Sequence, residues 1–281
     1  MKNWDIQKLL PLLRECGEIA LRYYDDPPME VKADKSIVTA ADKAIEKRLA
    51  EEFDRPEEGV YLIGEETVKN RSEEYIQNAL HGTAWVVDPI DGTAPYSIGL
   101  PAWGISVAFM ENGVIKEGAV YLPPQNDCLF TDGERVRRCA DMRGGGEPED
   151  FEFKLRPLSP ESVICVSQLG VKNALFHMSN QIFSWSGCVA SLYCLFTGKV
   201  LAYIASLNLW DIAASLAIME RSSIVARAGN GKKLTGVMDD DFFELAPDCG
   251  ERWKLRSYAV IAPDDETVDF VLQNSKFSER L

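Results

Sequence analysis

The chain has 281 residues, of which 46% are hydrophobic, and 30 Lys and Arg against 44 Asp and Glu give it a formal net charge of −14. This composition is typical of a folded globular protein, and because its acidity repels phosphate backbones and anionic lipids we expect no nucleic acid and no membrane as main partner. No apolar run approaches the roughly 20 residues of a membrane helix, and the charged first 24 residues do not resemble a signal peptide. These features predict a cytoplasmic protein.

Seven cysteines and two histidines limit the chemistry that the chain can carry. No pair of cysteines has the Cys-x-x-Cys spacing of a metal or redox site, so we expect reduced, mostly buried thiols. His81 and His177 are too few for a histidine-rich metal cage. Catalysis must therefore depend mainly on carboxylates.

The first part of the chain predicts two amphipathic helices and then two short strands. Apolar residues recur at helical spacing over residues 3–24, and a second apolar stripe follows from Thr39. Apolar runs at residues 60–63 and 85–87 predict strands. Both runs end on acidic residues, so both strands deliver carboxylates to their ends.

The middle of the chain predicts a hairpin and then a boundary. Strands at residues 105–110 and 114–121 flank an Asn-Gly pair, which favours a tight hairpin turn. Residues 136–160 are rich in Gly, Pro and charge, which is typical of an exposed connection. We therefore expect an N-terminal α+β lobe over residues 1–135, a connecting excursion over 136–160 and a C-terminal α/β lobe over 161–281.

Strands and helices alternate in the C-terminal lobe, as in α/β proteins. The pattern predicts strands at residues 163–166, 201–205, 223–226 and 258–262, and helices after Gly170, after Gly187, and at residues 211–221 and 264–273.

The most informative stretch lies at the end of the second predicted strand, where the chain reads Trp85-Val86-Val87-Asp88-Pro89-Ile90-Asp91-Gly92-Thr93. Two aspartates three residues apart can hold hard divalent cations, which prefer oxygen ligands. The proline stiffens the turn, and the glycine lets backbone amides approach an anion. A turn that uses Asp and Gly only for backbone reasons is the alternative for a generic Asp-x-x-Asp-Gly-Thr.

Two further acidic segments complete a set of four carboxylates. Glu65 follows the first predicted strand, and Asp211 lies at the start of a predicted helix. Taken singly, Glu65 is more often a solvated loop acid and Asp211 a helix N-cap. Together with Asp88 and Asp91 they indicate a metal site.

With these motifs the chain resembles the inositol monophosphatase family, within the lithium-sensitive, magnesium-dependent phosphatases. The resemblance extends over nearly the whole chain and rests on four segments in the family's order: Val38-Thr39-Ala40-Ala41-Asp42, Gly64-Glu65-Glu66-Thr67, Asp88-Pro89-Ile90-Asp91-Gly92-Thr93 and Trp210-Asp211-Ile212-Ala213-Ala214. It implies the layered αβαβα sandwich of inositol monophosphatase and fructose-1,6-bisphosphatase, a Mg²⁺-dependent phosphomonoesterase activity and a homodimer.

The resemblance also implies ligands for two to three Mg²⁺ ions. Glu65, Asp88 and the backbone carbonyl of Ile90 match the ligands of one ion. Asp88, Asp91 and Asp211 match those of a second, and a third, weaker ion would depend on Glu65. The N-terminal lobe would thus carry most metal ligands, and the C-terminal lobe Asp211 and the substrate pocket.

Catalytic roles follow from the same resemblance. A water activated by the metal would be oriented by Glu65 and Thr93, and Asp42 would hold the threonine hydroxyl. From the residues alone Asp42 is better explained by a capping box, since Thr39-x-x-Asp42 begins an amphipathic run. Gly92 and Thr93 would present backbone amides to the phosphate.

The predicted substrate pocket departs from the family. Ile204 stands where members that cleave inositol phosphates have an acid, seven residues before Asp211. Gly187 and Cys188 replace the family's Gly-Thr, so a thiol stands in place of a hydroxyl. We therefore expect Gly187, Cys188 and Ile204 to line a pocket with fewer polyol contacts, and Ile204→Glu to improve the efficiency on inositol 1-phosphate.

These features predict hydrolysis of a small phosphorylated metabolite, a polyol or sugar phosphate, with inositol 1-phosphate as leading candidate. Fructose 1,6-bisphosphate, adenosine 3′,5′-bisphosphate and histidinol phosphate are alternative substrates within the same chemistry. A non-catalytic regulatory relative is a third possibility, which the complete acidic set disfavours.

Overall fold

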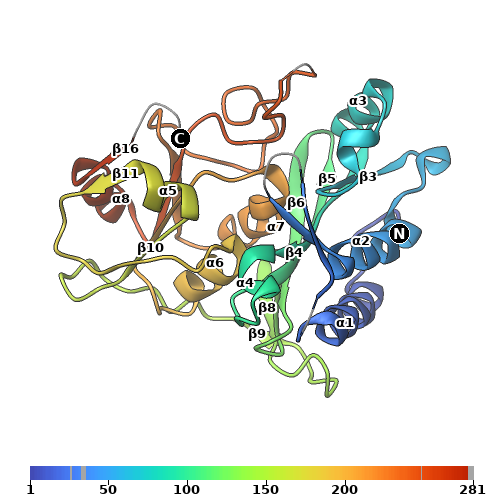
Figure 1. Ribbon diagram of the computed structural model, residues 1–281, viewed down its shortest axis with the longest axis horizontal. Coiled ribbons are helices and arrows are strands. Elements are labelled where there is room, and N and C mark those ends of the chain that lie inside the picture. The colour runs from blue at the N-terminus through green and yellow to red at the C-terminus, as the bar shows by residue number, and fades with distance from the viewer. Residues whose placement is uncertain (26, 33–35, 248, 278–281) are drawn as a thin grey trace.

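The computed structural model describes residues 1–25, 27–32, 36–247 and 249–277. Within these residues, helices and sheets alternate in five layers (Figure 1). Helices α1 (Ile6–Tyr23) and α2 (Ala40–Phe53) cover one face of a seven-stranded sheet, and α6 (Cys188–Phe196) and α7 (Leu209–Met219) cover the other. A five-stranded sheet follows, and its far face packs against α8 (Asp265–Gln273). The predicted αβαβα sandwich is confirmed.

The seven-stranded sheet carries the first two acidic motifs. Its order follows the sequence: β3 (Val60–Gly64), β4 (Thr83–Asp91), β5 (Gly104–Glu111), β6 (Val114–Leu122), β7 (Asp127–Asp132), β8 (Arg135–Cys139) and β9 (Glu149–Asp150). Only β3 and β4 are parallel, so both motifs leave the sheet at the same edge. The predicted hairpin at Asn112 is formed by β5 and β6.

The five-stranded sheet is mixed and carries the wall opposite these motifs. Its order is β12 (Ile182–Phe183), β10 (Ile164–Val166), β13 (Ala202–Ala205), β15 (Ala259–Ala262) and β14 (Val225–Ala228). Two small antiparallel pairs complete the strands, β1 (Met29–Val31) with β2 (Ile37–Thr39) and β11 (Ala174–Phe176) with β16 (Ser275–Phe277).

Short helices connect these layers. They are α3 (Glu73–His81), α4 (Thr93–Ser97), α5 (Gln168–Asn173) and the 3₁₀ turns Pro56–Glu58 and Val68–Asn70. None of the described helices is long and apolar enough to cross a membrane.

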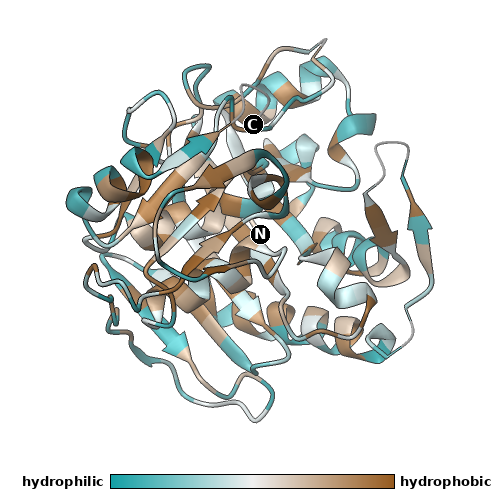
Figure 2. Ribbon diagram, turned by 60° about the vertical axis from the view of Figure 1, so that its left-hand side comes forward, coloured by the Kyte–Doolittle hydropathy of each residue, from teal (hydrophilic) through white to brown (hydrophobic). Residues whose placement is uncertain are grey.

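Apolar side chains fill the interfaces between layers. Hydrophobic stretches gather in the inner strands and helices, and hydrophilic stretches lie mostly in outer loops (Figure 2). Trp85 is fully buried and stacks on Phe53 of α2, with ring centroids 4.0 Å apart. Five of the seven cysteines are buried and the other two partly exposed, and all are free thiols, as predicted. The sheets are thereby held as rigid supports for the segments at their ends.

Two segments differ from the sequence-based expectation. Strands β8 and β9 fall within residues 136–160, and they extend the first sheet into the segment that we expected to connect two lobes. We expected a helix to begin after Gly170, but α5 begins earlier and includes this residue. The side chain of Ser167 caps α5 by accepting a hydrogen bond from the amide of Gly170. The division of the chain into lobes stays a prediction.

Candidate active site

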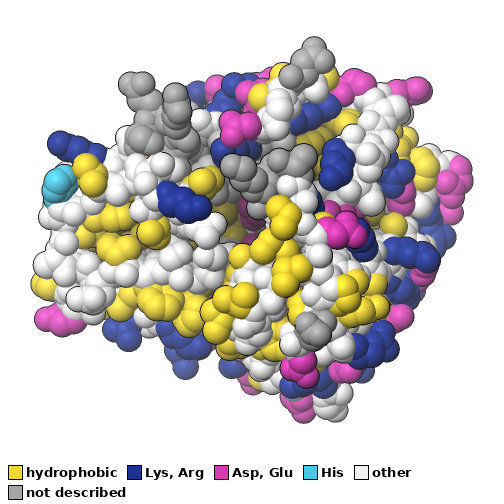
Figure 3. All heavy atoms as spheres, viewed as in Figure 1, with side chains coloured by type: hydrophobic (Ala, Val, Ile, Leu, Met, Phe, Trp, Pro, Cys, Tyr) yellow, Lys and Arg dark blue, Asp and Glu magenta, His cyan; other side chains and the backbone are white. Residues whose placement is uncertain are grey.

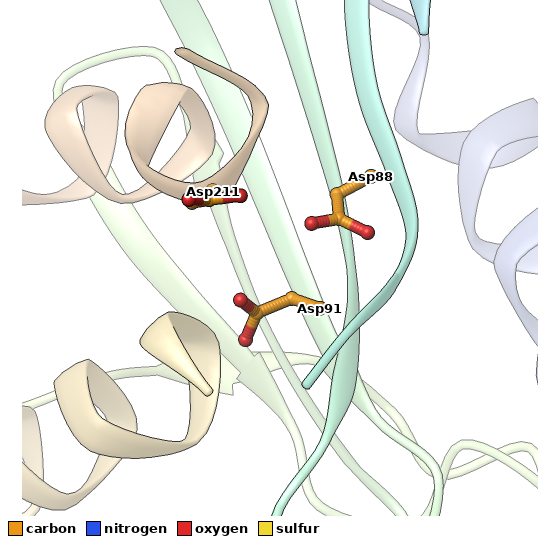
Figure 4. A group of neighbouring side chains, drawn as sticks. All are labelled: Asp88, Asp91 and Asp211. Atoms are coloured by element: carbon orange, nitrogen blue, oxygen red, sulfur yellow. The ribbon is translucent and has the colours of Figure 1, made fainter. Parts of the chain in front are cut away.

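Asp88 and Asp91 lie where β4 leaves the sheet. The pairing of β4 with β5 loses its regular register between these two residues. Gly92 follows with a φ of 87°, in the left-handed region that glycine adopts without strain. The irregular strand end turns both carboxylates toward the start of α7 (Figure 4). The transition from β4 to α4 thus positions Asp88 and Asp91.

Asp211 faces these two residues from the first turn of α7. One oxygen of each of the three carboxylates lies within 4.8 Å of the other two (Figure 4). The Asn208 amide donates to Asp211 Oδ2 at 2.8 Å, in a capping box of which Asn208 is the N-cap. Asp211 therefore both supports the helix start and contributes to the three-aspartate group Asp88, Asp91 and Asp211.

The N-terminus of α6 holds Asp91 in place. The amide of Cys188 donates to Oδ1 at 3.0 Å, and the amide of Val189 donates to Oδ2 at 2.6 Å. Gly187 precedes them, and a Cβ there would lie 2.8 Å from the carbonyl oxygen of Ala102. The segment predicted as substrate pocket therefore also contributes backbone amides that orient Asp91.

Glu65 lies just beyond β3 and faces the same cavity, which we call the metal cavity. This cavity has a volume of about 270 Å³ and is lined by Ser36, Ile37, Glu65, Asp88, Ile90, Asp91, Gly92, Thr93, Ala94, Ser186 and Asp211. Lys32 Nζ donates to Glu65 Oε1 at 3.2 Å and to Glu66 Oε1 at 2.7 Å. Glu65 is thus a partly buried, ion-paired side chain, and it stands outside the three-aspartate group.

Asp42 is buried and has both of the contacts considered from the sequence. Its carboxylate completes the capping box with Thr39 at the start of α2. Its Oδ1 also lies 3.4 Å from Thr93 Oγ1, which is 3.0 Å from the carbonyl oxygen of Ile90. Burial raises the pKa of Asp42 to about 6, against the hydrogen bonds from Thr39. The structure brings Asp42, Ile90 and Thr93 together; their catalytic roles stay predictions.

The electrostatics of the metal cavity favour a bound cation. Burial raises the pKa of Asp88 well above its usual range and that of Asp91 to about 8, and neighbouring carboxylates add to both shifts. Burial also raises the pKa of Glu65 to about 8, although Lys32 opposes the shift. Crowded carboxylates offer the hard oxygen donors that Mg²⁺ prefers, and a divalent cation offsets their repulsion. The residues present therefore fit Mg²⁺.

A second cavity adjoins the first. It has a volume of about 150 Å³, and its walls are Asp91, Ser167, Gln168, Leu169, Ser186, Gly187, Cys188, Tyr203, Ser206, Leu207 and Asp211. Asp91, Ser186 and Asp211 line both cavities. The face in Figure 3 is hollowed near its centre, in the region where α4, α6 and α7 meet in Figure 1. Gly187 and Cys188 line this second cavity, and their role in binding a substrate stays a prediction.

Ile204 does not line this cavity, which corrects the sequence-based expectation. Its side chain is fully buried and belongs to the core between the second sheet and α8, with Val260 and Val268. Successive side chains of a strand point to opposite faces, so Tyr203 of β13 faces the cavity and Ile204 faces away. The spacing of seven residues between Ile204 and Asp211 does not determine where the Ile204 side chain points, because that direction follows from the alternation along β13.

The sequence analysis assigned no role to Lys32, Ser186, Tyr203 or Ser206. Lys32 pairs with Glu65, and the other three line one or both cavities. The contact of Lys32 with Glu65 joins residues 33 positions apart, and no local pattern indicates it. Alternation along the strand 201–205 was an available signal for Tyr203, because it places this residue opposite to Ile204. Ser186 has a φ of 59°, which is uncommon for a residue with a side chain.

Comparison with known proteins identifies relatives of this chain. The sequence profile of the inositol monophosphatase family matches residues 5–239. The chain is 26% identical over 230 residues to a histidinol-phosphatase of Chlorobaculum parvum, covering 78% of this chain and 83% of the relative. It is 25% identical over 243 residues to a fructose-1,6-bisphosphatase/inositol-1-monophosphatase of Thermotoga maritima, covering 80% and 84%.

A solved structure shares the fold. The dual specific IMPase/NADP phosphatase bound with D-inositol-1-phosphate superposes with a TM-score of 0.71 at 19% identity, covering 95% of this chain and 94% of that chain. At this identity the likeness shows the architecture alone. The layers described above are therefore those of a known phosphatase fold.

Proposed function

The chain belongs to the inositol monophosphatase family and is a phosphoric monoester hydrolase, and we propose that its substrate is a small phosphorylated polyol or sugar, with inositol 1-phosphate as leading candidate. The observation that carries this proposal is the convergence of Asp88, Asp91 and Asp211 beside the Gly92-Thr93 turn. Hard oxygen donors and backbone amides at a glycine-containing strand-to-helix turn suit a phosphate ester.

In this proposal the site holds two to three Mg²⁺ ions. The three-aspartate group would bind them, with Glu65 and the carbonyl oxygen of Ile90 as further ligands. Bound Mg²⁺ supplies charge stabilisation to the phosphoryl group and lowers the pKa of water. Because the α6 amides hold Asp91 and the Asn208 amide holds Asp211, these carboxylates keep their positions without reorganisation.

The remaining residues orient the attacking water and the phosphate. Glu65 accepts a hydrogen bond from the water, while Lys32 holds the other end of that carboxylate. Thr93 Oγ1 would contact the same water, and Asp42 and the Ile90 carbonyl would set the direction of the Thr93 hydroxyl. The amides of Gly92 and Thr93, at the start of α4, contact the phosphate oxygens.

The names of relatives support two of the alternative substrates, histidinol phosphate and fructose 1,6-bisphosphate. Histidinol-phosphatase and fructose-1,6-bisphosphatase relatives match this chain at 26% and 25% identity, so similarity does not choose between them. We also keep the cytoplasmic location and the homodimeric state as proposals that rest on family membership.

A panel of substrates tests the proposal. Purified protein with Mg²⁺ is given inositol 1-phosphate, fructose 1,6-bisphosphate, adenosine 3′,5′-bisphosphate and histidinol phosphate, and kcat/KM is measured by phosphate release. The highest value is expected for inositol 1-phosphate, with no release in EDTA. A clear preference for another ester would replace the substrate, and no release from any ester above the Asp88→Asn background would favour the regulatory alternative.

A further inference from the structure

The second cavity contains a polar atom that the fold leaves without a partner. Ser206 Oγ is buried and, among the described residues, has no hydrogen-bond partner, although Ser206 lines the cavity. The residue lies between β13 and α7, five positions before Asp211. A buried hydroxyl without a partner is unfavourable, and a ligand in this cavity could supply the missing hydrogen bond.

The wall of the second cavity combines apolar side chains, Leu169 and Leu207, with several uncharged polar ones. Ser167, Gln168 and Tyr203 line it together with Ser206. Tyr203 is only 2% exposed, and no hydrogen bond of its hydroxyl is found within the described part of the chain. Hydroxyl and amide groups both donate and accept, so they match the hydroxyls of an alcohol.

Few charges line this cavity. Among the described residues that line the second cavity, Asp91 and Asp211 are the only charged side chains, and both belong to the three-aspartate group. A second phosphate placed here would find no Lys or Arg among the described lining residues to pair with it. The wall therefore favours a neutral leaving group.

We propose that Ser206 is a specificity-determining residue, whose hydroxyl hydrogen-bonds a hydroxyl of the leaving alcohol beside Asp211. The inference rests on the proposed phosphatase function and deepens it, since it names the leaving group as a neutral polyhydroxy alcohol. A site built to pair with a hydroxyl discriminates against analogues that lack one, because its own buried group then stays unpaired.

Two esters and three proteins test this role. Inositol 1-phosphate carries hydroxyls on its leaving group, and phenyl phosphate does not. Ser206→Ala is expected to lower kcat/KM for inositol 1-phosphate about tenfold, chiefly through KM, and to change that for phenyl phosphate by less than about twofold. Ser215→Ala is the matched control, because its buried Oγ on α7 is also unpartnered but it lines neither cavity.

The outcomes separate this inference from the proposed function. Equal losses for both esters in Ser206→Ala, or no loss for either, would overturn the role of Ser206 while leaving the phosphatase activity intact. A parent enzyme that hydrolyses phenyl phosphate but not the inositol ester would overturn it as well. Absence of phosphate release from every ester of the earlier panel would overturn the proposed function, and this inference with it.

Discussion

In the metal cavity, backbone amides fix the carboxylates before any ligand arrives, whereas in the second cavity the side chains keep unused hydrogen-bonding capacity. Asp91 accepts two amides of α6 and Asp211 accepts one from Asn208. Ser206 Oγ has no partner in the described part of the chain. The first region is built to hold charge in a set geometry, and the second is built to be completed by a ligand.

The two cavities also differ in the charge of their lining residues. The metal cavity concentrates buried carboxylates that raise one another's pKa values, so its metal-free form is strained by repulsion. Apart from Asp91 and Asp211, which it shares with the metal cavity, the second cavity has no charged side chain among its described lining residues. Substitutions in the first region should therefore act on turnover and metal affinity, and those in the second on the choice of substrate.

The largest expected effect is on Asp88 in the metal cavity. Asp88→Asn removes a charge at a position that is 1% exposed, and kcat should fall by about 10³-fold in saturating Mg²⁺, as measured by phosphate release. Thermal unfolding in EDTA is the control, because loss of a repelled carboxylate should leave the metal-free protein as stable as the parent or more stable. A rate within tenfold of the parent would contradict the role of Asp88 as a metal ligand.

Ile204 tests the boundary of the second cavity. Because its side chain lies in the core beneath α8, Ile204→Glu should bury an unpaired carboxylate and lower the free energy of unfolding by about 4 kcal/mol. Denaturant unfolding measures the loss, with Ile204→Val, expected at about 1 kcal/mol, as control. Better hydrolysis of inositol 1-phosphate by a stable Ile204→Glu protein would return this residue to the pocket.

The contrast between the regions explains what could be predicted from the sequence. Asp88 and Asp91 lie within one strand-to-turn motif, so their chemistry is readable over a few residues. Tyr203 and Ser206 come to Asp91 only through the packing of the second sheet, which the sequence pattern does not specify. The layered fold and the acidic set followed from motifs, whereas the direction of Ile204 depended on strand alternation that spacing alone ignores.

Thr93 separates water orientation from substrate binding. Thr93→Ala should lower kcat about 10²-fold with little change in KM, because a group that aligns the water acts mainly in the transition state. Steady-state kinetics measure both constants, and Thr93→Ser, which keeps a hydroxyl near Asp42, should recover most of the rate. An unchanged kcat in Thr93→Ala would leave this residue with a role in the turn alone.

The raised pKa values predict how metal and pH act together. Carboxyl groups of an unfolded chain have a pKa of about 4, whereas burial raises the pKa of Asp91 and of Glu65 to about 8 in the metal-free fold. The folded state therefore binds more protons between these values, and its stability falls as pH rises from 4 to 8. Tm in EDTA should decrease over this range, and the increase in Tm caused by Mg²⁺ should grow with pH. A Mg²⁺ effect that shrinks with pH would contradict the repulsion argument.

The smallest expected effect comes from Cys188, where the two regions meet. Its amide orients Asp91, which any residue can do, whereas its side chain is 2% exposed at the wall of the second cavity. Cys188→Ser keeps the amide and replaces the thiol by a stronger hydrogen-bonding group. We expect kcat/KM to change by less than about threefold for inositol 1-phosphate and to stay constant for phenyl phosphate. The reason is that the second cavity already has polar side chains in its wall.

Gly187 provides the comparison for that small effect. A Cβ at Gly187 would lie 2.8 Å from the Ala102 carbonyl oxygen and 3.3 Å from Asp91 Oδ2, so Gly187→Ala should displace the amides that hold this carboxylate. Because the displacement reaches the metal cavity, kcat should fall for both esters alike, by about tenfold or more. If Cys188→Ser lowered both rates as strongly as Gly187→Ala, the side chain as well as the backbone would belong to the metal-binding region.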